Sequence, residues 1–403
     1  MSETLMEQDE DLEIAGEAET VEEEGIIPLS DPDMTVADLE AVDAVLRTSW
    51  ISNGKTVDAF EEAFAAYLGR KYAIAVPSGS FGLVLGLEAL GIGPGDEVIA
   101  SSFSFRETVH AVSVRGAKPV FADIDYWSGT LAPSKIEDKI TENTKAIVAG
   151  NTNGHPAAWS ELRDVAKRHG LALIEDSTEA IGSTYKNDPV GTFGDFSVFD
   201  FSQPMPITCG EGGMVVTDDI DVAVAIRRRL LHRPEDRSSV VITATAPYQA
   251  PMSDMTAALG LSQLQRIDEI LAKRKLVERF YLSNVETFEG IKPPYIGPDV
   301  TEVHWFLYVV HLGTRFPRSS RDAIIEDLKV EQVEAAAYST PLHVQRHYYN
   351  LGYRRGDYFV TEKVADRAIA LPFHTHLEET QIEFLVETMK DASINVGAGS
   401  AIY

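Results

Sequence analysis

Residues 73–82 read Ala73-Ile74-Ala75-Val76-Pro77-Ser78-Gly79-Ser80-Phe81-Gly82, and this stretch decides the fold. Its first four residues are apolar, as in a strand buried on both faces, and the Pro-Ser-Gly that follows marks a turn into a helix. Six further apolar runs follow at intervals, several separated by segments of helical period: Glu97–Ala100, Pro119–Ile124, Lys145–Gly150, Ala172–Asp176, Phe196–Phe201 and Gly213–Thr217. Strands that alternate with helices predict an α/β fold with a mostly parallel seven-stranded sheet covered by helices.

Helices are expected where apolar residues recur every three or four positions. One such face begins at Val57, includes Phe60 and Phe64, and ends before Gly69. A long helix over about 264–280 is expected to lead into a smaller C-terminal α+β domain. The predicted organisation is an acidic disordered tail over 1–25, a large domain over 26–265, a small domain over 266–395 and a flexible tail over 396–403.

The composition is that of an acidic globular protein. Its 35 basic and 63 acidic side chains give a formal charge of −28, which disfavours nucleic acid and anionic membranes as partners. No apolar run reaches the roughly 18 residues of a membrane span, and the N-terminus is acidic instead of signal-like. We therefore expect a cytoplasmic protein.

A single cysteine, Cys209, excludes a disulfide within the chain. The pair His343 and His347 lacks a zinc-protease pattern, so no metal is expected.

Two segments could bind a ligand. Ser78-Gly79-Ser80 brings N–H groups and a hydroxyl to a helix N-terminus, where an anion binds well, although an ordinary turn with an N-cap has the same pattern. Asp176 ends a buried strand at the edge where parallel sheets bind ligands, although a helix cap or a buried ion pair also uses such an acid. The residues alone leave both alternatives open.

Together with other segments, these motifs resemble the DegT/DnrJ/StrS family of nucleotide-sugar aminotransferases from about residue 27 to 389. The resemblance implies the fold-type I aminotransferase architecture, a pyridoxal phosphate cofactor and a homodimer with active sites at the subunit interface. The further segments that carry it are Leu90–Ile99, Gly116–Phe121, Ile174–Asp176, Gly210–Met214, Ala257–Leu261, Pro341-Leu342-His343 and Leu371-Pro372.

The resemblance also assigns positions to single residues, from the cofactor to the sugar end of the site. They are Asp176 at the pyridine nitrogen, Phe105 stacked on the ring, Gly79 and Ser80 in the phosphate cup, Glu179 near the ring hydroxyl, Asp200 where a serine usually holds the phosphate, Gln249 in place of a loop asparagine, and His343 near the sugar.

The pattern breaks at the catalytic lysine. Alignment of Gly210-Glu211-Gly212-Gly213 with the family's glycine run places Met205 where the Schiff-base lysine belongs, and a thioether can neither form an imine nor move a proton. Asp200 would also repel a phosphate, by roughly 4 kcal/mol for unit charges about 4 Å apart at an effective dielectric near 20. We therefore expect no cofactor or a weakly bound one, with pyridoxal or pyridoxamine phosphate held only non-covalently.

These substitutions predict a non-transaminating family member related to amino-sugar biosynthesis. It would be a pseudo-enzyme that binds a small sugar-like ligand, as a homodimer or as a heterodimer with a paralogue that retains the lysine. One alternative is a lysine-less enzyme using pyridoxamine phosphate, like the family's sugar dehydratases, although those have a histidine at this position. Another is different chemistry in the same cavity, with Asp176, Glu179, Asp200 and His343 as acid–base groups.

Overall fold

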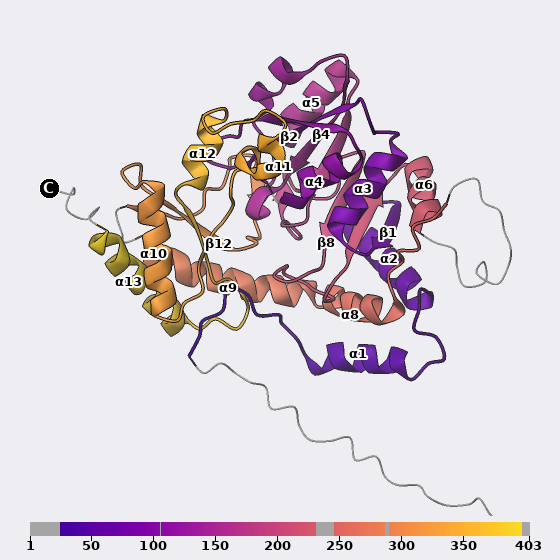
Figure 1. The fold of residues 1–403 in the computed structure, drawn as a ribbon. Helices are drawn as coiled ribbons and strands as arrows, with labels where there is room; N and C mark the ends of the chain where they lie inside the picture. The colour runs from indigo at the N-terminus through magenta and orange to yellow at the C-terminus, as the bar shows by residue number, and fades with distance from the viewer. Residues whose placement is uncertain (1–24, 105, 231–245, 287–289, 397–403) are drawn as a thin grey trace, which may run out of the picture.

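The computed structural model describes residues 25–104, 106–230, 246–286 and 290–396 (Figure 1). Its central sheet has seven strands, in which β9 runs antiparallel to both of its neighbours and the other pairs are parallel. This confirms the predicted mostly parallel sheet, and each apolar run singled out above forms one of its strands. In spatial order they are β1 (Tyr72–Val76), β9 (Gly213–Thr217), β8 (Phe196–Asp200), β5 (Ala172–Asp176), β4 (Thr144–Gly150), β2 (Glu97–Ser101) and β3 (Lys118–Ala122).

Helices cover both faces of this sheet because its strands are apolar on both faces. On β1, Ile74 and Val76 pack into one core cluster, with residues of α3 (Gly79–Ala89), α4 (Arg106–Val114) and α6 (Ile220–Leu230). Ala73 and Ala75 pack into the opposite cluster, with residues of α2 (Lys55–Leu68), α5 (Trp159–His169) and α8 (Asp254–Gln265). Gly86 lets α3 lie close to the sheet, since a Cβ there would stand 2.2 Å from the ring of Phe196.

Helix ends follow the local sequence signals. Gly69 and Gly170 end α2 and α5 in the left-handed region, at φ 71° and 63°, which glycine adopts without strain. Ser78 caps α3 by accepting a hydrogen bond from the N–H of Phe81 at 3.2 Å. The expected long helix is α9 (Ile267–Val285).

A second, four-stranded antiparallel sheet follows in the C-terminal part, with α10 (Arg318–Val330) and α13 (Glu379–Asn395) packed together beside it. Its order is β10 (Ile291–Lys292), β12 (Tyr308–Leu312), β14 (Ala368–Leu371) and β13 (Ala336–Ala337). Besides four short 3-10 helices, the described residues also form α1 (Val36–Leu46), α11 (Arg346–Tyr349), α12 (Phe359–Ala365), and a small sheet of β11 (Val300–Glu302), β6 (Thr184–Tyr185) and β7 (Asp188–Pro189).

The predicted tails over 1–25 and 396–403 lie outside the described residues apart from one residue each, and the predicted domain boundaries stay predictions. Ile27 packs with the core cluster of the C-terminal sheet and forms a bridge with Val333. In the part of the chain that the structure describes, no helix is both long and apolar enough to cross a membrane.

Candidate cofactor and substrate site

A cavity of about 340 Å³ lies where the loop after β2 and the loop after β5 meet the segment that follows β13. Most of its lining side chains are hydroxyl, amide or carboxyl groups, which hydrogen-bond to a polar ligand. The lining residues are Ser104, Glu179, Ala337, Tyr338, Ser339, Thr340, Leu342 and Gln345.

Asp176 lies at the carboxyl end of β5 and is 3% exposed. Its Oδ1 accepts hydrogen bonds from the N–H and the hydroxyl of Thr178, at 3.1 and 2.7 Å, and its Oδ2 accepts one from the hydroxyl of Thr108. Burial raises the pKa of Asp176 above its usual value, and nearby Asp200 adds to the shift, while the two threonines oppose it. This carboxyl group can hold a proton or face a cation, as a ligand-binding role for the acid at the end of β5 would require.

The preceding residue, Glu175, has a structural role instead. Its side chain points to the other face of the sheet and is fully buried. It accepts hydrogen bonds from six donors, which are Asn151 Nδ2, the hydroxyls of Ser177 and Ser197, and the N–H groups of Gly191, Phe193 and Gly194. Glu175 is therefore a structural acid held by neutral donors, neither a helix cap nor a member of a buried ion pair.

Glu179 faces the cavity from the loop after β5. Its Oε2 accepts hydrogen bonds from the N–H of Asn153 and the hydroxyl of Tyr338, both at 2.6 Å. Asn153 adopts a left-handed conformation at φ 53°, and its backbone and side chain bind the chain at Phe306 and Leu307. Glu179 is thereby connected to the C-terminal part of the chain through two contacts.

Asp200 lies at the carboxyl end of β8, next to the N-terminus of α3. Its Oδ2 accepts a hydrogen bond from the N–H of Gly79 at 2.8 Å, and its Oδ1 accepts one from the N–H of Ser202 at 2.8 Å. A carboxylate is favoured here because helix N-termini attract negative charge. Ser80 is half-buried in the first turn of α3. Gly79 and Asp200 therefore come together as expected for a phosphate cup, but with the carboxylate bound to the N–H group.

Met205 is 6% exposed and belongs to an apolar cluster whose other buried members lie in β12 and β14 or just before β12. The other members are Phe306, Leu307, Val309, Ala368 and Ala370, with Tyr338 packed against them. Tyr338 also lines the cavity. The alignment of position 205 with the lysine stays a prediction.

Two predicted site residues, Gln249 and His343, do not join this group. Phe105 lies outside the described residues. Gln249 is exposed in the segment after α6, at φ 53°. His343 is fully buried in the short helix η4 (Leu342–Val344), where its Nε2 lies 2.9 Å from Glu362 Oε1 and its ring packs against Tyr358.

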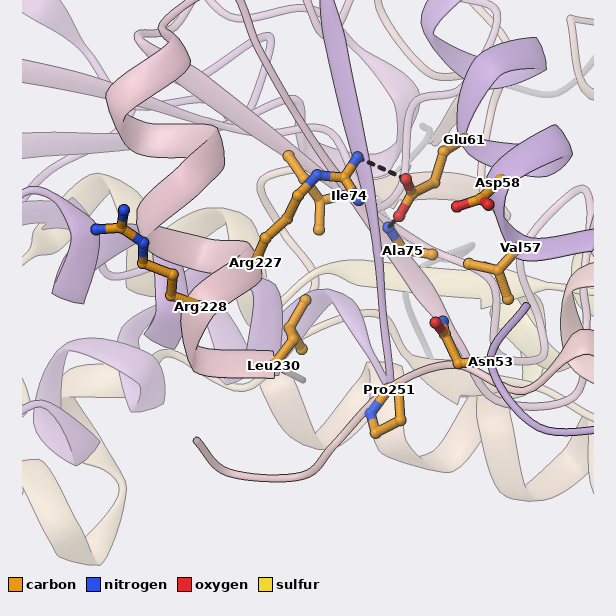
Figure 2. A pocket seen from close by; sticks show the side chains of 10 residues that line it. All are labelled: Asn53, Val57, Asp58, Glu61, Ile74, Ala75, Arg227, Arg228, Leu230 and Pro251. Carbon is orange, nitrogen blue, oxygen red and sulfur yellow. Dashed lines mark hydrogen bonds and ion pairs between the residues drawn. The ribbon is translucent and has the colours of Figure 1, made fainter. Parts of the chain in front are cut away.

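Another cavity, of about 250 Å³, lies between α2, β1 and α6 (Figure 2). Arg227 points toward Glu61, and its Nη2 lies 2.6 Å from Glu61 Oε2 and 3.0 Å from the carbonyl oxygen of Ala73. Glu61 Oε1 accepts a hydrogen bond from the N–H of Ala75 at 2.8 Å. Because β1 is an edge strand, this ion pair satisfies backbone groups that would otherwise be open to another strand.

Sequence reasoning missed the residues that hold the acids in place. Thr178 has a local signal, because a hydroxyl two residues after an aspartate commonly binds its carboxylate. Thr108 is 68 residues from Asp176, and Tyr338 is 159 residues from Glu179, so neither contact has a signature in the sequence.

Comparison with known proteins relates nearly the whole chain to one family. The family model described as the DegT/DnrJ/EryC1/StrS aminotransferase family matches residues 32–390. The chain is 33% identical over 376 residues to the spore coat polysaccharide biosynthesis protein SpsC of Bacillus subtilis, covering 91% of this chain and 96% of that protein. It is 35% identical over 346 residues to the GDP-perosamine synthase of Caulobacter vibrioides, covering 85% and 92%.

Solved structures agree with these relatives. The protein Spr1654 of Streptococcus pneumoniae, described as a sugar aminotransferase, matches in its PMP form with a TM-score of 0.88 and 28% identity, over 93% of this chain and 99% of that one. Its PLP form matches with a TM-score of 0.87 and 28% identity, over 92% and 99%. The resemblance and the fold-type I architecture are therefore confirmed.

The prediction of no cofactor, or of a weakly bound one, is wrong, while the prediction that binding is non-covalent stays a prediction. The matching structures include PMP and PLP forms, so the family uses pyridoxal phosphate. The prediction gave too much weight to Met205 and Asp200, although cofactor affinity is the sum of several contacts. The buried carboxyl group of Asp176 fits a ring nitrogen. At the start of α3, where a phosphate would bind, the N–H of Gly79 is hydrogen-bonded to Asp200, so a phosphate would have to displace that carboxylate. When bound, such a cofactor supplies an electron sink for carbanion chemistry.

Proposed function

Because this chain belongs to the DegT/DnrJ/EryC1/StrS aminotransferase family, we propose that it acts in amino-sugar biosynthesis as a member that does not itself transaminate. The observation that carries the proposal is Met205, since transamination by this fold needs an amine at that position to form an imine and to move the proton. The site keeps the carboxyl groups of Asp176 and Glu179, so it remains suited to bind a ring and a polar ligand.

The surroundings of Met205 support this proposal. Its thioether packs among apolar side chains, and no lysine is found among the described residues that line the cavity. His343, which could act as a base, is paired with Glu362 away from that lining. The groups at hand can bind, orient and hold a proton on a carboxyl, but none replaces the amine.

The test is the half-reaction with L-glutamate, measured as conversion of added pyridoxal phosphate to pyridoxamine phosphate by chromatography. The native chain is expected to convert it no faster than a protein-free control. Met205→Lys is expected to gain at least about a hundredfold, the usual contribution of a positioned proton-transfer group, and to become covalently labelled by the cofactor after borohydride reduction. Met205→Leu is the matched control and should behave as the native chain does. Conversion by the native chain as fast as by Met205→Lys would refute the proposal.

The chain is further proposed to function as a dimer, either with itself or with a paralogue that retains the lysine. Supporting this, α1 and the segment after it expose several apolar side chains, a pattern typical of interaction surfaces. They are Val36, Leu39, Leu46, Trp50 and Ile51, exposed by 68%, 69%, 55%, 42% and 47%. Light scattering of the chain alone and co-expressed with such a paralogue should give a dimeric mass, and a monomer in both samples would exclude it. The cytoplasmic location stays a prediction.

A further inference from the structure

The cavity between α2, β1 and α6 carries opposite charges on its two sides (Figure 2). Asp58 and Glu61 line it from α2, and Arg227 lines it from the last turn of α6. Burial raises the pKa of Glu61, which Arg227 opposes and Asp58 increases further, so the three charges are close enough to interact. Such a cavity matches a ligand that carries one positive and one negative group, because each charge of the ligand then meets its opposite.

Arg227 has N–H groups left for such a ligand. Its Nη2 donates to Glu61 Oε2 at 2.6 Å and to the carbonyl oxygen of Ala73 at 3.0 Å. A guanidinium has more N–H groups than these two contacts use, and none of the described residues accepts a hydrogen bond from Nε or Nη1. The side chain is 44% exposed, so the cavity is open to solvent at this point. The remaining N–H groups can therefore bind a ligand carboxylate while Glu61 stays paired.

Acceptors for a positive group lie on the other side of the cavity. Asp58 precedes Glu61 by one helical turn, and its carboxylate lies near that of Glu61 in Figure 2. Asn53 lines the cavity from the loop before α2, and its Nδ2 donates to the carbonyl oxygen of Met252 at 3.2 Å. This contact fixes the amide and leaves its oxygen as an acceptor. A carboxylate together with an amide oxygen suits an ammonium group, which only donates.

The rest of the cavity is mostly apolar and small. Val57, Ile74 and Leu230 line it and are each exposed by 3% or less. Pro251 lines it from the segment before α8. Its volume of about 250 Å³ equals roughly eight water molecules at about 30 Å³ each, which is room for one small organic ligand. An aliphatic group gains free energy when it leaves water for such a surface.

We propose that this cavity is a binding site for an aliphatic α-amino acid. Arg227 binds the carboxylate of the ligand, and Asp58 and Asn53 bind its ammonium. Its side chain packs between Val57 and Leu230. A ligand that lacks either charged group leaves a charged side chain of the cavity without its partner, so the site selects the zwitterion. Among the described residues, the cavity shares no lining residue with the candidate cofactor and substrate site, so the inference goes beyond the proposed function and does not depend on it.

The test is isothermal titration of the full chain with L-leucine and with two analogues that each lack one charge. Isocaproate keeps the carboxylate and the aliphatic chain but has no ammonium, and isoamylamine keeps the ammonium but has no carboxylate. L-leucine is expected to bind. Both analogues are expected to bind at least about tenfold more weakly, because each loses a hydrogen bond to a charged group.

Variants on each side of the cavity locate the site. Asp58→Asn and Arg227→Gln should each weaken L-leucine binding about tenfold or more, since each removes one charge that the ligand meets. Their matched controls are Glu62→Gln, exposed on α2 next to Glu61, and Arg228→Gln, whose guanidinium points away from Glu61 in Figure 2. Both controls should keep the affinity of the native chain.

Three results would overturn the inference. They are the absence of L-leucine binding at millimolar concentration, equal affinity for L-leucine and either analogue, and unchanged affinity in Asp58→Asn, which would place the bound amino acid elsewhere. Urea unfolding of each variant shows whether it folds as the native chain does. The analogues are titrated into the native chain, so their result stands even where a variant fails to fold.

Discussion

Replacement of Glu175 by glutamine should separate the structural acid of β5 from its neighbour Asp176. The change keeps the shape of the side chain but turns one carboxylate oxygen into an NH₂ group. At the Oε1 end this group would face the N–H of Gly191 and the amide of Asn151, and at the Oε2 end the N–H groups of Phe193 and Gly194. In either orientation two buried donors lose their acceptor, whereas the serine hydroxyls can rotate.

The expected loss of stability follows from that count. Each buried donor left without an acceptor costs about 1–3 kcal/mol, so Glu175→Gln should lower the free energy of unfolding by roughly 4 kcal/mol. Urea unfolding followed by circular dichroism measures this loss, and Glu383→Gln, on the exposed face of α13, is the control with no expected change. A loss below about 1 kcal/mol for Glu175→Gln would refute the assigned structural role, because that is less than one buried donor is worth.

Two further predictions concern charged side chains outside the candidate cofactor and substrate site. Burial opposes ionisation of Asp33, but hydrogen bonds from Arg266 and Lys273 lower its pKa to about 2. The ionised carboxylate should therefore stabilise the folded chain by about 2 kcal/mol at pH 5 and by roughly half of that at pH 3. Asp33→Asn should abolish this part of the pH dependence of the free energy of unfolding in urea, and an unchanged pH dependence would contradict the prediction. Arg227→Ala leaves buried Glu61 without its cation, so it should lower the free energy of unfolding by about 1–3 kcal/mol in the same assay. Arg228→Ala is the control and should lower it little, because the side chain of Arg228 points away from Glu61 in Figure 2. Equal losses in the two variants would argue against the role of the ion pair at the edge strand.

Local signals in the sequence determined the secondary structure of the large sheet. Apolar runs bounded by turn residues predicted its strands, because a strand covered on both faces must be apolar throughout. The end of α2 was predicted equally well, since Gly69 adopts the left-handed conformation at little cost in free energy. These runs did not predict the strand order, which only the folded chain shows.

The position of Asp176 could also be predicted, because it depends on where one strand ends. Its partner Thr108 could not, and neither could the pairing of Glu179 with Tyr338, because such contacts join side chains far apart in the chain.

Asp200 shows the same division. Its sequence position identified it as a substitution, but only the folded chain shows its carboxylate bound to the N–H of Gly79, 121 residues away. His343 was assigned to the sugar end, whereas packing around η4 directs its ring toward Glu362. Residue types and short-range spacing determine which groups the chain carries, but tertiary packing decides which of them meet, since hydrogen bonds between distant segments leave no periodic pattern in the sequence.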